Sequence, residues 1–237
     1  MSRDASGQLW LHAGTGAGAT KAPVLVGAGW QSFSSIVLAD DFNGDGKQDL
    51  MVRDSAGGLW LYRGNAASGW SSALRIGSGW QIFSNIFGAG DFNGDGKADV
   101  IAAESNGALW LYPGDGKGGW MTRKLIGSGW QIFNSVVPAG DLNGDGFADV
   151  LARDTAGQLW LYPGDGAGDW LPRVLVGTGW HGYGMIVGKG DLSGDGKTDV
   201  LARDPAGIMQ LYAGDGASGF APVQPIPGTW SQYNWIG

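Results

Sequence analysis

The nine residues Asp41-Phe42-Asn43-Gly44-Asp45-Gly46-Lys47-Gln48-Asp49 set the period of the whole chain, because they recur three more times at intervals of fifty residues. Positions one, three, five and nine carry a carboxylate, an amide or hydroxyl, a carboxylate and a carboxylate. Ca²⁺ prefers about six to eight oxygen ligands in a flexible shell, and this alternation supplies them. The glycine at position six permits a sharp turn around the ion, and position seven would offer its backbone carbonyl.

The sequence therefore predicts four Ca²⁺ sites, in loops 41–49, 91–99, 141–149 and 191–199. One Asp-Gly turn would mean little, but four copies in register favour a metal site. The predicted ligands are Asp41, Asn43, Asp45, Lys47 and Asp49; Asp91, Asn93, Asp95, Lys97 and Asp99; Asp141, Asn143, Asp145, Phe147 and Asp149; and Asp191, Ser193, Asp195, Lys197 and Asp199. The helical calcium hand fits less well, because Val52 stands where its bidentate glutamate would be.

The segments between the loops read as short strands with no helical period. In the first complete unit we expect strands near 34–40, 49–54, 58–63 and 72–77. The recurring Leu-Trp-Leu-Tyr run is apolar on both faces, so both faces of the sheet should be covered. A four-stranded sheet repeated every 40 to 50 residues is typical of a β-propeller blade.

Five units of fifty exceed the length of 237 residues by thirteen, and the missing positions correspond to a fifth loop. We therefore predict a single all-β domain over residues 1–237, a five-bladed β-propeller of four-stranded blades. The N-terminus would supply strands two to four of the closing blade, and residues 230–237 would supply its first strand. We expect a monomeric closed ring, and the alternative is a piece of a larger ring that closes by oligomerising.

Composition excludes several classes of partner. The chain has no cysteine and a formal net charge of −7, but twelve of its 22 acidic residues lie in the four loops. No basic patch predicts nucleic-acid binding. No apolar run approaches the roughly eighteen residues of a membrane span, so membrane insertion is not expected. No basic and apolar leader follows Met1, so any signal peptide has been removed or never existed. We expect a secreted or surface protein, because calcium is plentiful outside the cell.

The repeated motif resembles the FG-GAP (VCBS) repeat family, which occurs in the integrin α-subunit head and in many secreted bacterial proteins. The resemblance rests on Asp-x-Asn-x-Asp-Gly-x-x-Asp, the apolar strand after it and the Leu-Trp-Leu-Tyr-x-Gly strand, and it covers essentially the whole chain. It implies a calcium-bound β-propeller with the loop side chains as metal ligands. Ser193 departs from the pattern with a shorter side chain, and familiar members have seven blades.

Catalytic residues are not evident, so we expect no enzymatic activity. When the repeats are aligned at intervals of fifty residues, equivalent positions form columns. His12 and His181 do not recur in their columns, and Glu104 is the one glutamate. The repeated aspartates are accounted for as metal ligands or turn residues, so no pair of acids remains for glycoside hydrolysis. In the Arg53-Asp54 column we expect an ion pair that stabilises a turn.

Thirteen tryptophans form three columns plus Trp235. We expect the column of Trp60 to be core and the column of Trp70 to cover a blade edge. The third column precedes the first strand of each blade, where it either wedges neighbouring blades or stacks on sugar rings. Its candidate ligand-binding residues are Trp30, Gln31, Trp80, Gln81, Trp130, Gln131, Trp180, His181 and Trp230.

The expected function is that of a multivalent, carbohydrate-binding module stabilised by Ca²⁺, in which repeated weak sites add avidity. Its partners would be glycans or a surface protein. A protein-adhesion or targeting module appended to a secreted enzyme is the second hypothesis, and an enzyme domain the third. An engineered repeat scaffold is also compatible with the closely matched repeats.

Overall fold

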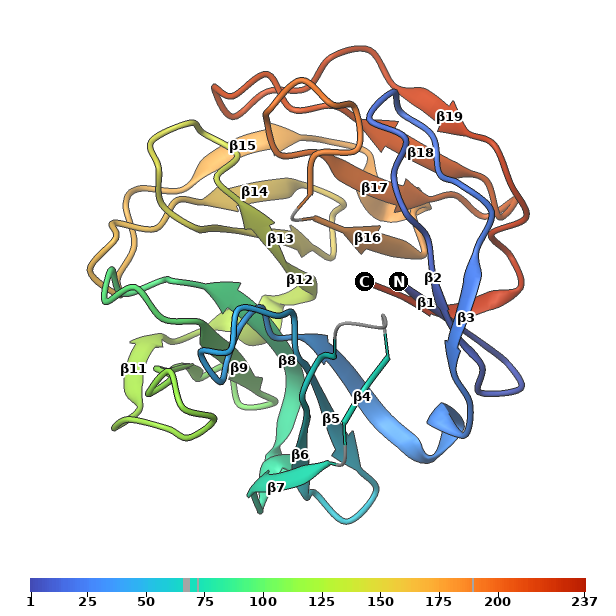
Figure 1. Ribbon diagram of the computed structural model, residues 1–237. Helices are drawn as coiled ribbons and strands as arrows, with labels where there is room; N and C mark the ends of the chain where they lie inside the picture. The colour runs from blue at the N-terminus through green and yellow to red at the C-terminus, as the bar shows by residue number, and fades with distance from the viewer. Residues whose placement is uncertain (66–68, 72, 189) are drawn as a thin grey trace. The chain divides into compact units, whose positions relative to one another are not determined.

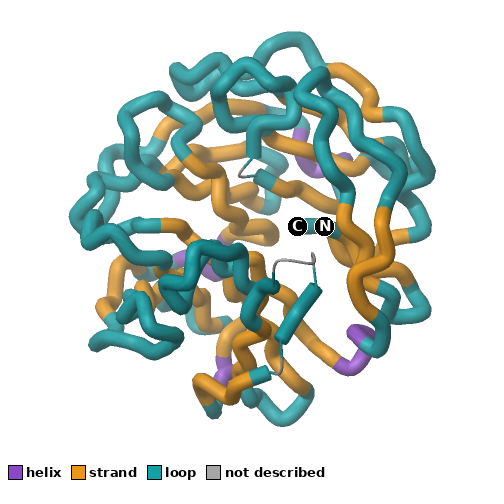
Figure 2. Tube along the Cα trace, in the orientation of Figure 1, coloured by secondary structure: helices purple, strands orange, loops and turns teal. Residues whose placement is uncertain are grey.

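The chain is all-β. A computed structural model describes residues 1–65, 69–71, 73–188 and 190–237. These residues form twenty strands in five four-stranded antiparallel sheets. Figure 2 shows that helix is confined to short turns of chain. They are the 3₁₀ helices η1 (Trp30–Ser32), η2 (Trp80–Ile82), η3 (Trp130–Ile132) and η4 (Trp180–Gly182). Within the described residues, no helix has the length and apolar character needed to cross a membrane.

One compact unit comprises residues 30–132 and 165–169 and contains two of the sheets. The strands of each sheet pair in chain order. The first sheet consists of β4 (Phe33–Leu38), β5 (Leu50–Asp54), β6 (Leu59–Tyr62) and β7 (Leu74–Gly77). The second consists of β8 (Phe83–Gly90), β9 (Asp99–Glu104), β10 (Leu109–Tyr112) and β11 (Lys124–Gly127).

The other compact unit comprises residues 1–29, 133–164 and 170–237 and contains three sheets. The third sheet consists of β12 (Phe133–Gly140), β13 (Asp149–Asp154), β14 (Leu159–Tyr162) and β15 (Val174–Gly177). The fourth consists of β16 (Met185–Val187), β17 (Val200–Arg203), β18 (Met209–Tyr212) and β19 (Gln224–Ile226). The fifth consists of β20 (Tyr233–Ile236), β1 (Ser2–Asp4), β2 (Leu9–Leu11) and β3 (Val24–Gly27).

The fifth sheet is shared between the two ends of the chain, as the sequence predicted. Strand β20 pairs with β1 in antiparallel register, Ser2 opposite Ile236 and Arg3 opposite Trp235. The N–H of Gly237 donates to the carbonyl of Met1 at 3.0 Å. Figure 1 shows both ends of the chain beside these strands.

The Leu-Trp-Leu-Tyr strands explain how each sheet builds a core. Leu59 and Leu61 of β6 are fully buried, while Trp60 and Tyr62 on the other face are half-buried. Successive side chains of a strand point to opposite faces, so one face packs as core and the other is covered by longer side chains. Five such sheets at a period of fifty residues are the blades of a five-bladed β-propeller, which confirms the predicted fold class.

Candidate functional site

Each acidic loop connects the first strand of a blade to the second. In loop 41–49 the carboxylate of Asp41 organises the turn, because its Oδ1 accepts the N–H groups of Gly44 and Asp45 at 2.8 and 2.9 Å. Its Oδ2 accepts the N–H of Gly46 at 2.8 Å. Gly46 has a φ of 81°, in the left-handed region that favours glycine. The first aspartates of the other three loops accept the equivalent hydrogen bonds.

The ninth aspartate of each loop is buried, with 1–3% of its surface exposed. In Asp49, Oδ2 accepts the N–H groups of Phe42 and Asn43 at 3.1 Å, and Oδ1 accepts the N–H of Gly64 at 3.0 Å. This side chain therefore ties the loop to the segment that follows the third strand. Burial raises the pKa of its counterparts Asp99 and Asp149 to about 6, although the hydrogen bonds oppose that rise.

The side chains at the third and fifth positions form hydrogen bonds within the loop. In loop 91–99, Asn93 Oδ1 accepts the N–H of Asp95, and Asp95 Oδ1 accepts the N–H of Lys97. All four side-chain positions thus carry oxygen atoms, a donor chemistry that fits Ca²⁺. Among the described residues, however, no three Asp, Glu, His or Cys side chains converge as a metal cluster. The carboxylates of positions one and nine accept backbone N–H groups, and metal binding stays a prediction.

The five tryptophans of the third column are all buried, with 4–7% exposed surface. In the second blade, Trp80 packs against Tyr112 at 4.6 Å and Trp120 at 5.5 Å between ring centroids. In the fourth blade, Trp180 packs against Tyr212 at 4.5 Å and Phe220 at 6.1 Å. These rings are covered by aromatic neighbours of their own blade, so they offer little face to a ligand.

The polar residue after each of these tryptophans is exposed, and several lie against a turn. A Cβ placed on Gly57 would lie 1.8 Å from Gln81 Oε1, and one on Gly107 would lie 1.6 Å from Gln131 Oε1. The adjacent N–H of Trp80 donates to the carbonyl of Gly57 at 3.0 Å. The glutamines therefore pack closely on turns that only glycine permits, and a ligand-binding role for them stays a prediction.

The prediction of an ion pair between the arginine and the aspartate of the Arg53-Asp54 column was wrong. Arg153 donates to the carbonyls of Trp180, at 2.9 Å, and of Tyr183. Asp154 accepts the N–H of Ala156 and the indole N–H of Trp160, at 3.0 and 3.1 Å. The two side chains diverge because neighbouring residues of a strand point to opposite faces.

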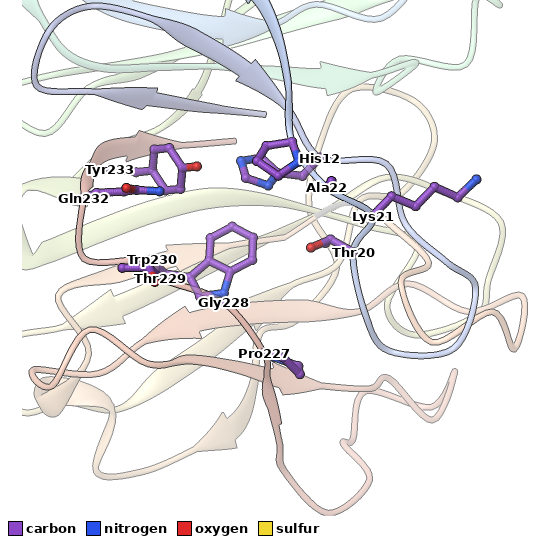
Figure 3. A pocket seen from close by; sticks show the side chains of 11 residues that line it. His12, Thr20, Lys21, Ala22, Pro227, Gly228, Thr229, Trp230, Gln232 and Tyr233 are labelled. Atoms are coloured by element: carbon purple, nitrogen blue, oxygen red, sulfur yellow. The ribbon is translucent and has the colours of Figure 1, made fainter.

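The fifth blade departs from the pattern of aromatic cover. His12 stands where the other blades have tyrosine, and Thr20 stands in the column of Trp70, Trp120, Trp170 and Phe220. A pocket of about 390 Å³ lies beside Trp230 in this blade. It is lined by His12, Thr20, Lys21, Ala22, Pro23, Pro227, Gly228, Thr229, Trp230, Gln232 and Tyr233. Figure 3 shows the hydroxyl of Thr20 on the side of Trp230, whereas Lys21 extends away.

His12 forms one wall of the pocket. Its ring lies 4.9 Å from Trp230 at an interplanar angle of 35° and meets the ring of Tyr233 edge-on at 5.2 Å. Its Nε2 lies 2.7 Å from the hydroxyl of the buried Ser2. Burial, together with the nearby amino terminus, lowers the pKa of His12 to about 4, so the ring is neutral at pH 7. Of the lining residues, sequence reasoning proposed Trp230 alone as a ligand contact; the departures at His12 and Thr20 were the available signal.

The FG-GAP-like repeat family matches the chain three times, over residues 41–102, 91–152 and 141–202. Since these matches span more than half of the sequence, the chain belongs to this family. No curated protein matches it in sequence.

Two solved lectin structures share the fold. One is a lectin from Agrocybe aegerita that recognises non-reducing terminal N-acetylglucosamine, with 24% identity, a TM-score of 0.54, and coverage of 79% of this chain and 50% of that one. The other is the BP39L lectin from Burkholderia pseudomallei, with 19% identity, a TM-score of 0.55, and coverage of 88% and 60%. The chain thus spans only half to three-fifths of the length of these lectins.

Proposed function

We propose that this chain is a non-enzymatic carbohydrate-binding β-propeller that is stabilised by Ca²⁺. The observation that carries the proposal is the pocket beside Trp230, which combines aromatic walls with hydroxyl and amide groups. Apolar faces of sugar rings stack on aromatic side chains, and sugar hydroxyls require hydrogen-bonding partners. The two lectins that share the fold make the same class of ligand the first to test.

Calcium would act in this protein as a structural ion. Side chains at positions one, three, five and nine of each loop, with the carbonyl of position seven, are the groups that would hold it. Bound Ca²⁺ supplies positive charge beside a buried carboxylate, and its binding free energy becomes folding free energy. The proposed setting is outside the cell or at its surface, where calcium is plentiful.

All five third-column indoles are buried, which argues against one sugar site in each blade. Five equivalent sugar platforms would need five exposed rings. The proposal therefore rests on the pocket of the fifth blade, and avidity would come from several chains presented together.

Protein adhesion is the second candidate, because apolar side chains are exposed on outer strands. Val24 of β3, Leu74 of β7 and Leu125 of β11 are 59%, 53% and 51% exposed. Apolar groups on strand edges are a common basis of protein contact. Exposed apolar side chains of this kind would bind a protein and not a sugar.

A glycan array probed with the calcium-loaded protein tests the leading proposal. We expect binding to a defined set of glycans, weakened after chelation. Absence of binding to every glycan, with the protein folded by circular dichroism, would exclude the carbohydrate function. Binding to a surface protein under the same conditions would then favour adhesion.

A further inference from the structure

The cover on the third-column tryptophan differs in one blade. In the first blade, the ring of Trp30 packs against Tyr62 at 5.0 Å and Trp70 at 6.4 Å. The second and fourth blades repeat this arrangement with a tyrosine and a second large aromatic ring. A tyrosine and a tryptophan or phenylalanine thus occupy the space beside the indole in these blades.

In the fifth blade both covering rings are replaced by smaller, more polar side chains. His12 keeps a planar ring against Trp230 but is shorter than tyrosine, and Thr20 has no ring. Protein interiors are densely packed, so the loss of two large side chains without backbone collapse leaves a cavity. The pocket of about 390 Å³ is lined by both of these residues, where the missing rings would lie.

Polar groups surround this space. Thr20, Thr229 and Gln232 offer hydroxyl and amide groups at the pocket, each able to donate and to accept. Trp230 Nε1 is buried and has no hydrogen-bond partner in the structure. A buried donor without a partner is unfavourable, and a polar ligand or a water would relieve it. Of the described residues that line the pocket, none is acidic.

We infer that the fifth blade holds the saccharide site of this chain, and that it takes one terminal pyranose ring in the pocket beside His12, Thr20 and Gln232. This inference rests on the proposed carbohydrate function and adds the location, the number of sites and the size of ligand. Ligand pockets span about 300–1,000 Å³, so a pocket of about 390 Å³ suits a single ring and not a chain of sugars. One site per chain follows from one departure among the blades.

The test restores the aromatic cover of the other blades. The variants are Thr20→Trp and the double variant His12→Tyr/Thr20→Trp, and the matched control is Thr15→Trp, which adds the same indole to the same loop outside the pocket. Isothermal titration uses the methyl glycosides of glucose, N-acetylglucosamine, fucose and glucuronic acid in the presence of calcium. We expect one ligand per chain, a loss of affinity of at least about tenfold in both variants, since the added ring occupies the ligand volume, and no change in the control.

The outcomes separate the two claims. Binding of four or five ligands per chain, or full affinity in Thr20→Trp, would overturn the site while leaving the carbohydrate function standing. Absence of saccharide binding by the unmodified protein on both the array and the titration would overturn both. If the double variant fails to fold, the single variant with its control still decides the location.

Discussion

The fourth and fifth blades place the same tryptophan in different surroundings. Trp180 and Trp230 are equally buried, with 5% and 4% exposed surface. Trp180 is covered by Tyr212 and Phe220, whereas Trp230 is covered by His12 and borders a pocket. The comparison teaches that a repeat protein can confine a pocket to one unit by changing the neighbours of a shared residue and not the residue itself.

The two blades also meet at a predicted metal loop. The fourth blade has loop 191–199. The hairpin of the fifth blade rests on that loop, because the N–H of Gly18 donates to the carbonyl of Leu192 at 2.9 Å. A Cβ on Gly194 would lie 2.2 Å from the carbonyl oxygen of Gly16, so the backbones are in close contact. The neighbouring acidic loop therefore supports the hairpin that carries Thr20 and lines the pocket.

Of the changes that would separate the fourth blade from the fifth, removal of calcium should have the largest effect on stability. At a free concentration about 100 times its Kd, each ion stabilises the fold by about 2.7 kcal/mol. For a chain of this size, each site would then shift Tm by roughly 5–11 °C. Calorimetry with and without chelator measures the shift, and hydrogen exchange should show lost protection in loop 191–199. An unchanged Tm would contradict the proposed role of calcium.

Truncating the two tryptophans sharpens the comparison further. Trp180→Ala should cost about 3–5 kcal/mol of unfolding free energy, because it opens a cavity inside a complete aromatic cluster. Trp230→Ala should cost about 1–2 kcal/mol less, since one side of the ring already borders a pocket. Urea unfolding of both variants measures the difference. Equal losses would show that the pocket is filled by neighbouring side chains in solution.

His12 gives the fifth blade a pH dependence that the fourth lacks. Its pKa is lowered to about 4 in the fold, below the unfolded value near 6.5. The stabilising contribution is therefore complete above pH 6.5 and is lost as the pH falls from 6.5 toward 4. We expect a loss of about 1–2 kcal/mol after allowing for solvent screening.

The matched variant for this measurement is His12→Tyr, which places the residue of the fourth blade in the fifth. Between pH 7 and 4.5, the unfolding free energy of this variant should then lack the pH dependence that His12 contributes. Asp99 and Asp149, with pKa values raised to about 6, act in the opposite direction in metal-free protein. Their contribution grows as the pH falls through 6, and subtraction of the variant from the parent removes it.

The contact between loop 191–199 and the pocket hairpin predicts a coupling between calcium and saccharide. Asp195→Asn should weaken saccharide binding about fivefold, near the lower end of typical coupling between sites. The control Asp95→Asn makes the same change in loop 91–99, which contacts residue Gly168 instead. Titration with the methyl glycoside that binds the parent protein measures both. Equal effects of the two variants would exclude a local coupling.

A substitution at the rim of the pocket should have the smallest effect on saccharide binding. Lys21 is exposed and lines the pocket without pointing toward Trp230 (Figure 3). Lys21→Gln should weaken binding of methyl glucuronide by about two- to fivefold at low salt, because exposed charge pairs contribute about 0.2–1 kcal/mol. Affinity for neutral glycosides should not change. A loss for neutral and acidic glycosides alike would mean that Lys21 contacts the ring itself.

Much of the fold could be predicted because its signals are local. The strands Leu59–Tyr62 and Leu50–Asp54 follow from apolar runs bounded by turn residues, and the four-stranded unit follows from their spacing. The direction of Arg153 could not be predicted, since its acceptors lie in the next blade, at Trp180 and Tyr183. The sequence places an aspartate beside this arginine, but the pleat of the strand separates the two side chains.

The candidate site was predicted only in part. Trp230 was among the proposed ligand contacts, whereas Gln232 and Tyr233 were not, because a column of tryptophans does not indicate which ring borders open space. That depends on residues distant in the chain, here His12 and Thr20. Their departures from the repeat were visible in the sequence, but the cavity between them required knowledge of the packing.

By itself, the amino-acid sequence determined the repeat, the strands, the oxygen-rich loops and the number of blades, because turns and strand patterns act over a few residues. The tertiary structure alone decided that the ninth aspartates are buried, that the third-column indoles are covered and that a pocket lies beside Trp230. Burial and open volume are properties of many side chains packed together, and segments as far apart in sequence as Thr20 and Trp230 must meet before either exists.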